Sequence, residues 1–286
     1  MTQPYIEQRI FGKTHQAVTC VGLGGEGVLR THGREQEARA VLQAAIDQGI
    51  TYFDSARVYA ESELYYGKLW GKYSEIRATI FQASKSANRN KTNALADLEQ
   101  TLDRLQTDYL DLWQIHDVRT PQDIALIAGP GGALEAFVEA KAAGKVRFIG
   151  VTGHHDPKIL TQAVREWPVD AVMMPVNPVE EILDGFLTET LPAARKKGMA
   201  VIGMKVLGAA HFILPQTRVT AAALIRYALS FDIDVAIVGC ATPAEVKSLA
   251  DTGGMAKPLA GKERRYLLRL FKPIARRLAY YRGVVD

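Results

Sequence analysis

Hydrophobic and polar positions follow a regular order along the chain, in which short apolar runs alternate with longer stretches of helical spacing. The short runs are rich in Val and Ile and lack strict alternation, which is typical of strands that helices cover. Apolar residues recur every three to four positions in the longer stretches, which predicts amphipathic helices. Eight strands are expected, at residues 18–22, 50–54, 77–85, 109–116, 146–151, 169–174, 199–205 and 235–238.

Helices are expected between these strands. Gly49 and Gly144 follow two of the helical stretches, and glycine readily ends a helix. The connection after the fourth strand is longer and polar, and it passes through Pro121 and residues 129–132. The expected helices are residues 34–48, 62–73, 92–105, 133–143, 158–166, 185–197 and 220–230, and a last helix begins at Pro243.

This alternation predicts an α/β protein whose parallel strands close into a (β/α)8 TIM barrel. A doubly wound open sheet is the alternative, and it needs a glycine-rich phosphate turn where the first strand meets the first helix. Residues 22–27, which include Gly24, lie at that junction, but they lead into a polar connection and the helix starts later. The closed barrel is therefore favoured. One barrel takes ~250 residues, so residues 1–286 are expected to form a single domain.

Composition adds only exclusions to this picture. With 48% hydrophobic and 23% charged residues, the chain resembles an ordinary soluble globular protein. A net charge of +4 is too small to indicate nucleic acid or a membrane surface as a partner. No apolar run approaches the ~20 residues of a membrane span, and we expect no secretion signal. Cys20 and Cys240 are too few for a disulfide scaffold, which favours packing roles in a reducing cytoplasm. The oligomeric state is not determined by the sequence.

Residues 262–286 form a basic, amphipathic C-terminal tail. We expect a helix that closes the barrel, broken in two at Pro273, with its charges facing water. Docking on an anionic surface is the alternative. Tyr280 and Tyr281 are candidates to reach the active face.

Polar, chemically capable side chains stand at the carboxyl ends of three expected strands. Asp54 ends the second strand and Tyr59 follows it closely. Lys85 ends the third strand and His116 ends the fourth. Parallel barrel strands direct their carboxyl ends to one face, where catalytic groups collect. These four residues therefore predict a catalytic rim.

Together the four side chains suit proton donation to a carbonyl oxygen. Tyr59 has an ordinary pKa of about 10, and a Lys85 ammonium beside it favours the phenolate. Asp54 holds that ammonium charged and oriented. His116 offers a neutral donor for a carbonyl oxygen or a proton relay to Tyr59. None of the four can deliver a hydride, so a reductant must be a cofactor.

These motifs resemble the aldo-keto reductase superfamily, and the likeness covers nearly the whole chain. The resemblance implies a (β/α)8 barrel that binds NAD(P)H across its C-terminal face and reduces an aldehyde or ketone. It also implies Tyr59 as general acid, Lys85 and Asp54 as its tuning pair, and His116 as the substrate-orienting group. The matching pieces are Phe53-Asp54-Ser55-Ala56 with Tyr59 and Ser62-Glu63, Ser84-Lys85, Ile115-His116, Gly150-Val151-Thr152 and Ile237-Val238-Gly239.

The chain departs from the family's pattern around the cofactor. Thr152-Gly153, followed by His154-His155, stands where many members have Ser-Asn, and Met173 stands in place of Gln. Met204 or Lys205 replaces a ring-stacking aromatic, and residues 239–243 lack the lysine that often binds a 2′-phosphate. The cofactor contacts that the resemblance implies are Gly24, Thr152, Gly153, His154, Asn177, Met204, Lys205, Leu207, Gly239, Cys240, Thr242 and Glu245.

Cofactor preference follows from charge at the 2′ position. Glu245 falls where an arginine often sits, and a carboxylate repels a 2′-phosphate. Lys247 is close enough in sequence to supply a substitute cation for that phosphate. The family's usual preference favours NADPH, with NADH as the alternative.

The histidines and Lys85 also allow other interpretations. His154-His155 with His116 offers three imidazoles, but adjacent histidines point in different directions and no further ligand completes a set, so no metal site is expected. Two functional alternatives stay open: a non-catalytic NADP(H)-binding regulatory barrel, and a lyase that uses Lys85 as a Schiff-base nucleophile. An Asp54 that keeps Lys85 charged argues against the lyase.

Overall fold

Eight parallel strands close into a barrel in the computed structural model of the protein, which describes residues 5–217, 219–254 and 259–283. Each strand pairs with its neighbour in chain order, and the last strand pairs with the first, which confirms the predicted (β/α)8 barrel. The barrel strands are β3 (Val21–Gly27), β4 (Tyr52–Asp54), β5 (Phe81–Ser86), β6 (Leu110–Ile115), β7 (Val146–Thr152), β8 (Ala171–Pro175), β9 (Ala200–Met204) and β10 (Val235–Cys240).

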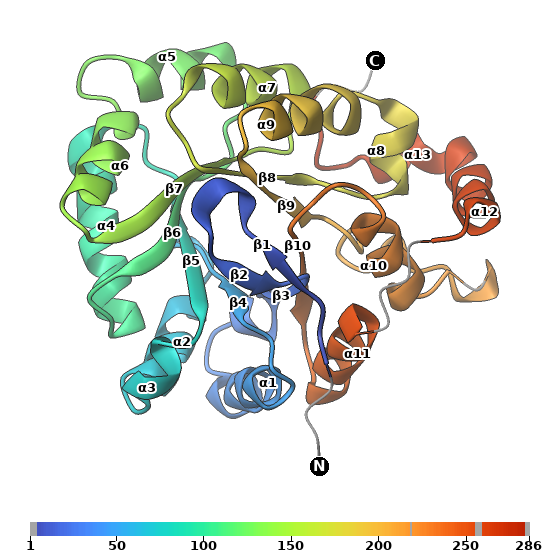
Figure 1. Cartoon of the computed structure of the whole chain (residues 1–286), viewed down its shortest axis with the longest axis horizontal. Helices are drawn as coiled ribbons and strands as arrows, with labels where there is room; N and C mark the ends of the chain where they lie inside the picture. Colours follow the sequence, from blue (N-terminus) through green and yellow to red (C-terminus); the bar gives the residue numbers. More distant parts are fainter. Residues whose placement is uncertain (1–4, 218, 255–258, 284–286) are drawn as a thin grey trace.

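Helices surround the barrel on its outside (Figure 1). Their apolar sides pack on the strands and enclose most of the core, as expected for a parallel sheet. The helices that follow the predicted order are α1 (Glu35–Asp47), α2 (Ser62–Trp70), α4 (Lys91–Leu105), α6 (Ala133–Ala142), α7 (Pro157–Glu166), α9 (Leu191–Lys196), α10 (Ala221–Leu229) and α11 (Pro243–Gly254).

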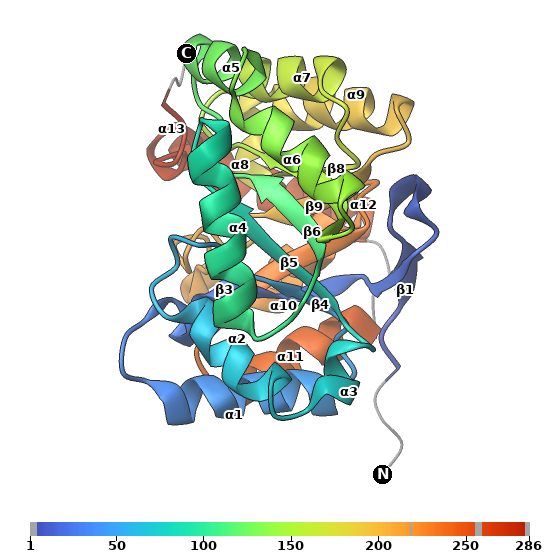
Figure 2. The same ribbon diagram turned by 90° about the vertical axis from the view of Figure 1, so that its left-hand side faces the viewer.

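An antiparallel hairpin covers one end of the barrel, and sequence reasoning missed it. Its strands are β1 (Gln8–Ile10) and β2 (Ala17–Thr19), and the prediction merged the second of them with the start of β3. Phe11 follows β1 and inserts among the barrel residues, with ring centroids 4.8 Å from Phe81. Burying one such side chain contributes roughly 1.5–3 kcal/mol. Figure 2 shows the hairpin at the end of the barrel opposite to the C-terminal segment.

The glycine-rich segment belongs to the first barrel strand, which corrects the predicted bounds of that strand, residues 18–22. β3 continues through Gly24 to Gly27, and a Cβ on Gly24 would lie only 3.1 Å from the backbone nitrogen of Gly239 on β10. Missing side chains let the two strands approach closely. Backbone pairing rather than side-chain hydrophobicity therefore decides that this segment is a strand.

Three short helices also differ from the prediction. α3 (Ser74–Arg77) includes Arg77, the first residue of the expected third strand, and the guanidinium of Arg77 pairs with the buried Asp111 at 2.8 Å. α5 (Pro121–Ala128) replaces the expected polar connection and begins with a capping box formed by Thr120 and Asp123. α8 (Pro178–Leu183) and a π-helical turn (Phe186–Thr190) precede α9.

The tail crosses beside α8 and contains two helices, α12 (Gly261–Phe271) and α13 (Ala275–Leu278). A 3-10 turn, Lys272–Ile274, separates them, so the predicted break at Pro273 is confirmed. Residues 284–286 of the predicted tail lie outside the described residues. Cys20 and Cys240 are buried and not bonded to each other, and burial raises the pKa of each thiol to about 12. Among the described helices, none is both long and apolar enough to cross a membrane.

Candidate active site

A buried ion pair joins two barrel strands at the rim. The Lys85 ammonium on β5 lies 2.5 Å from a carboxylate oxygen of Asp54 on β4, and both side chains are almost fully buried. It also donates to the backbone carbonyl of Ser55 at 2.6 Å. Burial raises the pKa of Asp54, and the nearby Lys85 charge opposes that shift. The pair predicted from sequence is therefore formed and fixed in one orientation.

Tyr59 lies directly above this pair. The Lys85 ammonium is 4.9 Å from the centroid of its ring. A Cβ on Gly25 of β3 would come within 2.9 Å of the Tyr59 ring, so the absence of a side chain there admits the tyrosine. The guanidinium carbon of Arg30 lies 4.7 Å from the same ring centroid. Sequence reasoning missed Gly25 and Arg30, because contacts with Tyr59 join segments about thirty residues apart.

Burial makes Tyr59 a weaker acid than the sequence predicted. Its pKa is raised well above the ordinary tyrosine value, first by burial and then by the carboxylates of Asp54 and Glu26. Arg30 opposes this rise. The expectation that a neighbouring ammonium favours the phenolate is thus outweighed in the free protein. Tyr59 keeps its proton at neutral pH, as a proton donor must.

His116 faces Tyr59 from the end of β6, with ring centroids 5.6 Å apart in an edge-to-face arrangement. Burial and the Lys85 charge lower its pKa to about 3, so the imidazole is neutral at physiological pH. Its buried Nδ1 has no hydrogen-bond partner among the described residues. Arg89 donates to the backbone carbonyls of His116 and Asp117, each at 2.7 Å, and thereby fixes the segment that carries the histidine.

One cavity of about 490 Å³ opens beside the tetrad. Of the predicted cofactor contacts, Thr152, His154, Met204 and Lys205 line it, together with Met173. The other lining residues are Tyr59, Lys85, His116, Glu26, Arg30, Val58, Ala87, Arg89, Asp117, Arg119 and Asp123. The structure thus gathers three of the four tetrad residues and part of the predicted cofactor set around a single space.

Five predicted contacts lie at the junction of β3, β10 and α11, beside the cavity. Gly239 and Cys240 are in β10, next to Gly24. Thr242 and Glu245 are at the start of α11, where the Glu245 carboxylate accepts from the backbone nitrogen of Ala241 at 2.6 Å. Lys247, the candidate substitute cation, instead pairs with Asp251 at 2.6 Å.

The remaining contacts lie elsewhere. Gly153 is buried beside Val118, and Leu207 is partly buried against the core. Asn177 is fully buried and caps α8, and its amide also donates to Lys205 and Tyr281. That amide is therefore fully engaged within the protein. As cofactor contacts, all twelve residues stay predictions.

His154 and His155 both make contacts with the C-terminal segment. His154 Nδ1 lies 3.0 Å from the backbone carbonyl of Tyr281, and Nε2 lies 3.4 Å from Asp117. The backbone carbonyl of His155 accepts from Gly283. Within residues 5–217, 219–254 and 259–283, no group of three or more His, Cys, Asp or Glu side chains could hold a metal ion.

Fold and site together define a (β/α)8 barrel with its reactive groups at the carboxyl ends of the strands. The aldo/keto reductase family model matches residues 20–218, and the chain belongs to the aldo/keto reductase family. L-galactose dehydrogenase from Arabidopsis thaliana is 28% identical over 220 residues, which cover 71% of this chain and 66% of that protein.

Two further relatives extend the comparison. An aldo-keto reductase from Schizosaccharomyces pombe, named with NADP(+), is 28% identical over 210 residues, or 68% of this chain and 59% of that protein. The chain therefore spans less than two thirds of the length of these curated relatives. The holo form of an aldo-keto reductase from Bacillus halodurans has a TM-score of 0.74 and 23% identity, covering 93% of this chain and 96% of that chain. At this identity the likeness supports the fold.

Proposed function

We propose that the protein is an NAD(P)H-dependent oxidoreductase that reduces an aldehyde or ketone to an alcohol. Tyr59 is the general acid, Lys85 and Asp54 tune it, and His116 orients the carbonyl. The observation that carries this proposal is the buried Lys85–Asp54 pair beneath a protonated Tyr59. On the sequence argument alone, the compartment proposed is a reducing cytoplasm.

Each side chain has a task that its environment supports. Tyr59 retains its proton until a carbonyl oxygen becomes an alkoxide, because its pKa is raised by burial. As Tyr59 gives up that proton, the fixed Lys85 ammonium 4.9 Å from its ring stabilises the negative charge that develops. His116 stays neutral, so it can donate one hydrogen bond to the carbonyl without adding a competing charge.

A nicotinamide cofactor would supply the hydride, and the residues present fit such a group. Met173, Met204 and Thr152 give the cavity beside Tyr59 an apolar wall with one hydroxyl. Gly24 and Gly239 keep the nearby β3–β10 junction free of side chains. The name of the Schizosaccharomyces pombe relative and the family resemblance favour NADPH. NADH stays the alternative, because the carboxylate of Glu245 at the start of α11 would repel a 2′-phosphate.

The contacts of Lys85 disfavour the Schiff-base lyase. Its ammonium is held by Asp54 and by the carbonyl of Ser55, whereas a nucleophilic amine must be neutral. The regulatory alternative shares the cofactor site and differs only in turnover.

The test is a titration with NADPH and NADH, followed by turnover of an aldehyde panel by the wild type and Tyr59→Phe. We expect Tyr59→Phe to lose about 10²–10⁴-fold in kcat while its cofactor Kd stays unchanged. Near wild-type turnover in Tyr59→Phe would remove this residue from the mechanism. Cofactor binding by the wild type without turnover of any aldehyde would favour the regulatory barrel.

A further inference from the structure

Lys205 brings an unpaired cation to the cavity that Tyr59 and His116 line. The cavity's three arginines are paired: Arg30 with Glu26 at 2.8 Å, Arg89 with Asp123 at 2.9 Å, and Arg119 with Asp117 at 2.5 Å. No carboxylate of the described residues lies within ion-pairing distance of the Lys205 ammonium. Burial lowers the pKa of Lys205; the carboxylates of Glu26 and Asp117 oppose this shift, and the charges of Arg30 and Lys85 add to it. A partly desolvated cation without a counter-ion is stabilised by an anion that a ligand supplies.

The backbone of Lys205 is held in an unfavourable conformation. Its φ is +55°, in the left-handed region that side chains other than glycine rarely adopt. Gly208, Ala209 and Ala210 in the following loop also have positive φ. Backbone strain of this kind collects at ligand sites.

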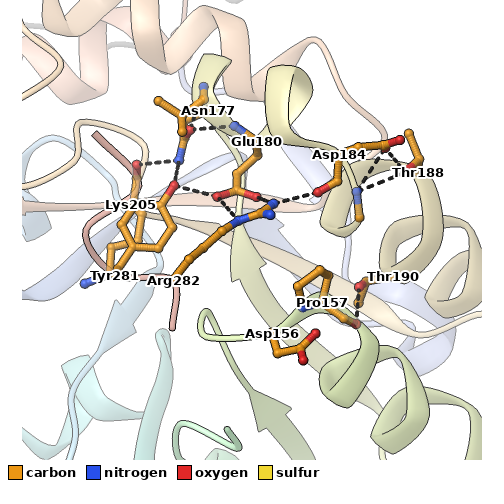
Figure 3. Close-up of polar contacts among 12 residues, drawn as sticks. Asp156, Pro157, Asn177, Glu180, Asp184, Thr188, Thr190, Lys205, Tyr281 and Arg282 are labelled. Carbon is orange, nitrogen blue, oxygen red and sulfur yellow. Dashed lines mark hydrogen bonds and ion pairs between the residues drawn. The ribbon is translucent and has the colours of Figure 1, made fainter. Parts of the chain in front are cut away.

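Hydrogen bonds from distant elements maintain this conformation (Figure 3). The carbonyl of Lys205 accepts from the Asn177 amide at 3.1 Å and from the backbone nitrogen of Gly208 at 3.1 Å. The Asn177 amide also donates to the Tyr281 hydroxyl at 3.1 Å, which in turn donates to Glu180 at 2.6 Å. Arg282 forms a buried ion pair with the same Glu180.

The tail is therefore part of the site's support. Glu180 is fully buried, and its two partners come from the C-terminal segment about one hundred residues later. Figure 3 shows Tyr281 between Glu180 and the Asn177–Lys205 contact. The backbone carbonyl of Tyr281 also faces His154, another cavity residue, at 3.0 Å.

We propose that Lys205 is an anion-binding residue of the active cavity, positioned by the Tyr281–Asn177 network of the tail. Its ligand is an anionic oxygen group of a bound reactant, either a carboxylate of the carbonyl substrate or a phosphate of the dinucleotide. This inference rests on the proposed function for the identity of the reactants. The two sources share one chemistry, and separate measurements distinguish them.

The decisive variants are Lys205→Met, which removes the charge, and Lys205→Arg, which keeps it. Lys196→Met is the matched control, because Lys196 is an exposed lysine in α9, at the other end of β9. One measurement is the Kd of NADPH and NADH at low and high salt. The other is kcat/KM for 4-carboxybenzaldehyde and for its uncharged methyl ester.

A phosphate ligand predicts that Lys205→Met raises both dinucleotide Kd values roughly 10-fold or more and reduces their salt dependence. A carboxylate ligand predicts unchanged Kd values and a roughly 10-fold loss confined to the carboxylate aldehyde. In either case Lys205→Arg should keep most of the wild-type affinity or rate, and Lys196→Met should keep all of it. Wild-type behaviour of Lys205→Met in both measurements would overturn the proposal, and so would equal defects in Lys205→Arg and Lys205→Met.

The tail's contribution is tested with Tyr281→Phe, and Tyr280→Phe is the control. The Tyr280 side chain is about half exposed, and its hydroxyl makes no hydrogen bond with the described residues. Tyr281→Phe should shift the same measurement as Lys205→Met, in the same direction and by less, whereas Tyr280→Phe should not. If Tyr281→Phe lowers only the thermal stability and leaves anion binding intact, the positioning role is wrong.

Inorganic pyrophosphate gives a readout that is independent of turnover. Millimolar pyrophosphate should raise the thermal midpoint of the wild type and of Lys196→Met, and raise that of Lys205→Met less. A wild type that binds no dinucleotide and reduces no aldehyde refutes the proposed function, while this shift still decides the role of Lys205. Equal shifts in the wild type and Lys205→Met would refute anion binding by Lys205.

Discussion

Replacing Lys85 with methionine should damage stability and catalysis separately, and the two effects can be divided. Lys85→Met leaves the Asp54 carboxylate buried without its cation. Removing one partner of a buried ion pair costs about 3–5 kcal/mol, because the remaining charge is uncompensated. Asp54→Asn in the same chain removes that charge. The double variant should therefore regain at least about half of the lost free energy of unfolding.

The pH dependence of this loss has a definite sign. The folded-state pKa of Asp54 is raised by burial even beside Lys85, and without Lys85 the main influence that lowers it is gone. The folded protein then binds more protons than the unfolded chain above a pH of about 4, where an unperturbed Asp ionises. The stability of Lys85→Met should fall as pH rises from that point toward the folded pKa. Its deficit against the wild type should be smaller at low pH than at neutral pH.

Urea unfolding measures the free energy of unfolding, and kcat with a reactive aldehyde measures the catalytic effect. Turnover should be reduced by about 10²–10⁴-fold in Lys85→Met and should remain low in the double variant, since neither has the cation near Tyr59. A double variant that regains turnover along with stability would refute the tuning role of Lys85. A Lys85→Met variant as stable as the wild type would refute the claim that Asp54 without Lys85 is a destabilising buried charge.

Two further predictions concern Tyr59 and His116. Arg30→Met removes the guanidinium 4.7 Å from the Tyr59 ring and should lower kcat roughly 2- to 5-fold, the effect of a half-exposed cation–π contact. Its control is Glu26→Gln, which keeps the cation and removes a carboxylate that raises the Tyr59 pKa, and which should not lower kcat. A loss in Glu26→Gln equal to that in Arg30→Met would contradict this account. The rate should also stay flat from about pH 5 to 8, because His116, with a pKa of about 3, is already neutral there and Tyr59 is still protonated; an inflection in that range that disappears in His116→Asn would count against it.

The sequence placed the four residues at one rim because each lies at or soon after the end of an expected strand, and their catalytic roles stay predictions. Asp54 ends β4, and His116 follows β6, so the barrel geometry alone brings them to one rim. Lys85 is paired in register with Gln114 on the neighbouring strand, next to the end of both strands. The apolar strands of a parallel barrel can be predicted from hydrophobicity alone. Their carboxyl ends could therefore be located without knowledge of tertiary contacts.

Other features depended on backbone pairing and distant contacts. β3 carries four glycines, so hydrophobicity could not mark the end of the strand at Gly27. The capping box of Thr120 and Asp123 marks the start of α5 and could have identified this helix, which the prediction treated as a polar connection. The contact of Tyr281 with Glu180 spans 101 positions, and no local pattern encodes it.

The environment of Tyr59 reconciles two requirements that a general acid must meet. Before reaction it must hold its proton, and burial beside the carboxylates of Asp54 and Glu26 raises its pKa enough to do so. As the proton leaves, negative charge on the phenol must be stabilised, and the cations of Lys85 and Arg30 already lie within 5 Å of its ring centroid. Catalysis gains from interactions that strengthen as charge develops, and fixed cations need no reorganisation at that moment. A raised pKa in the free protein therefore agrees with acid catalysis by Tyr59, since the groups that raise it act before the reaction and the cations act during it.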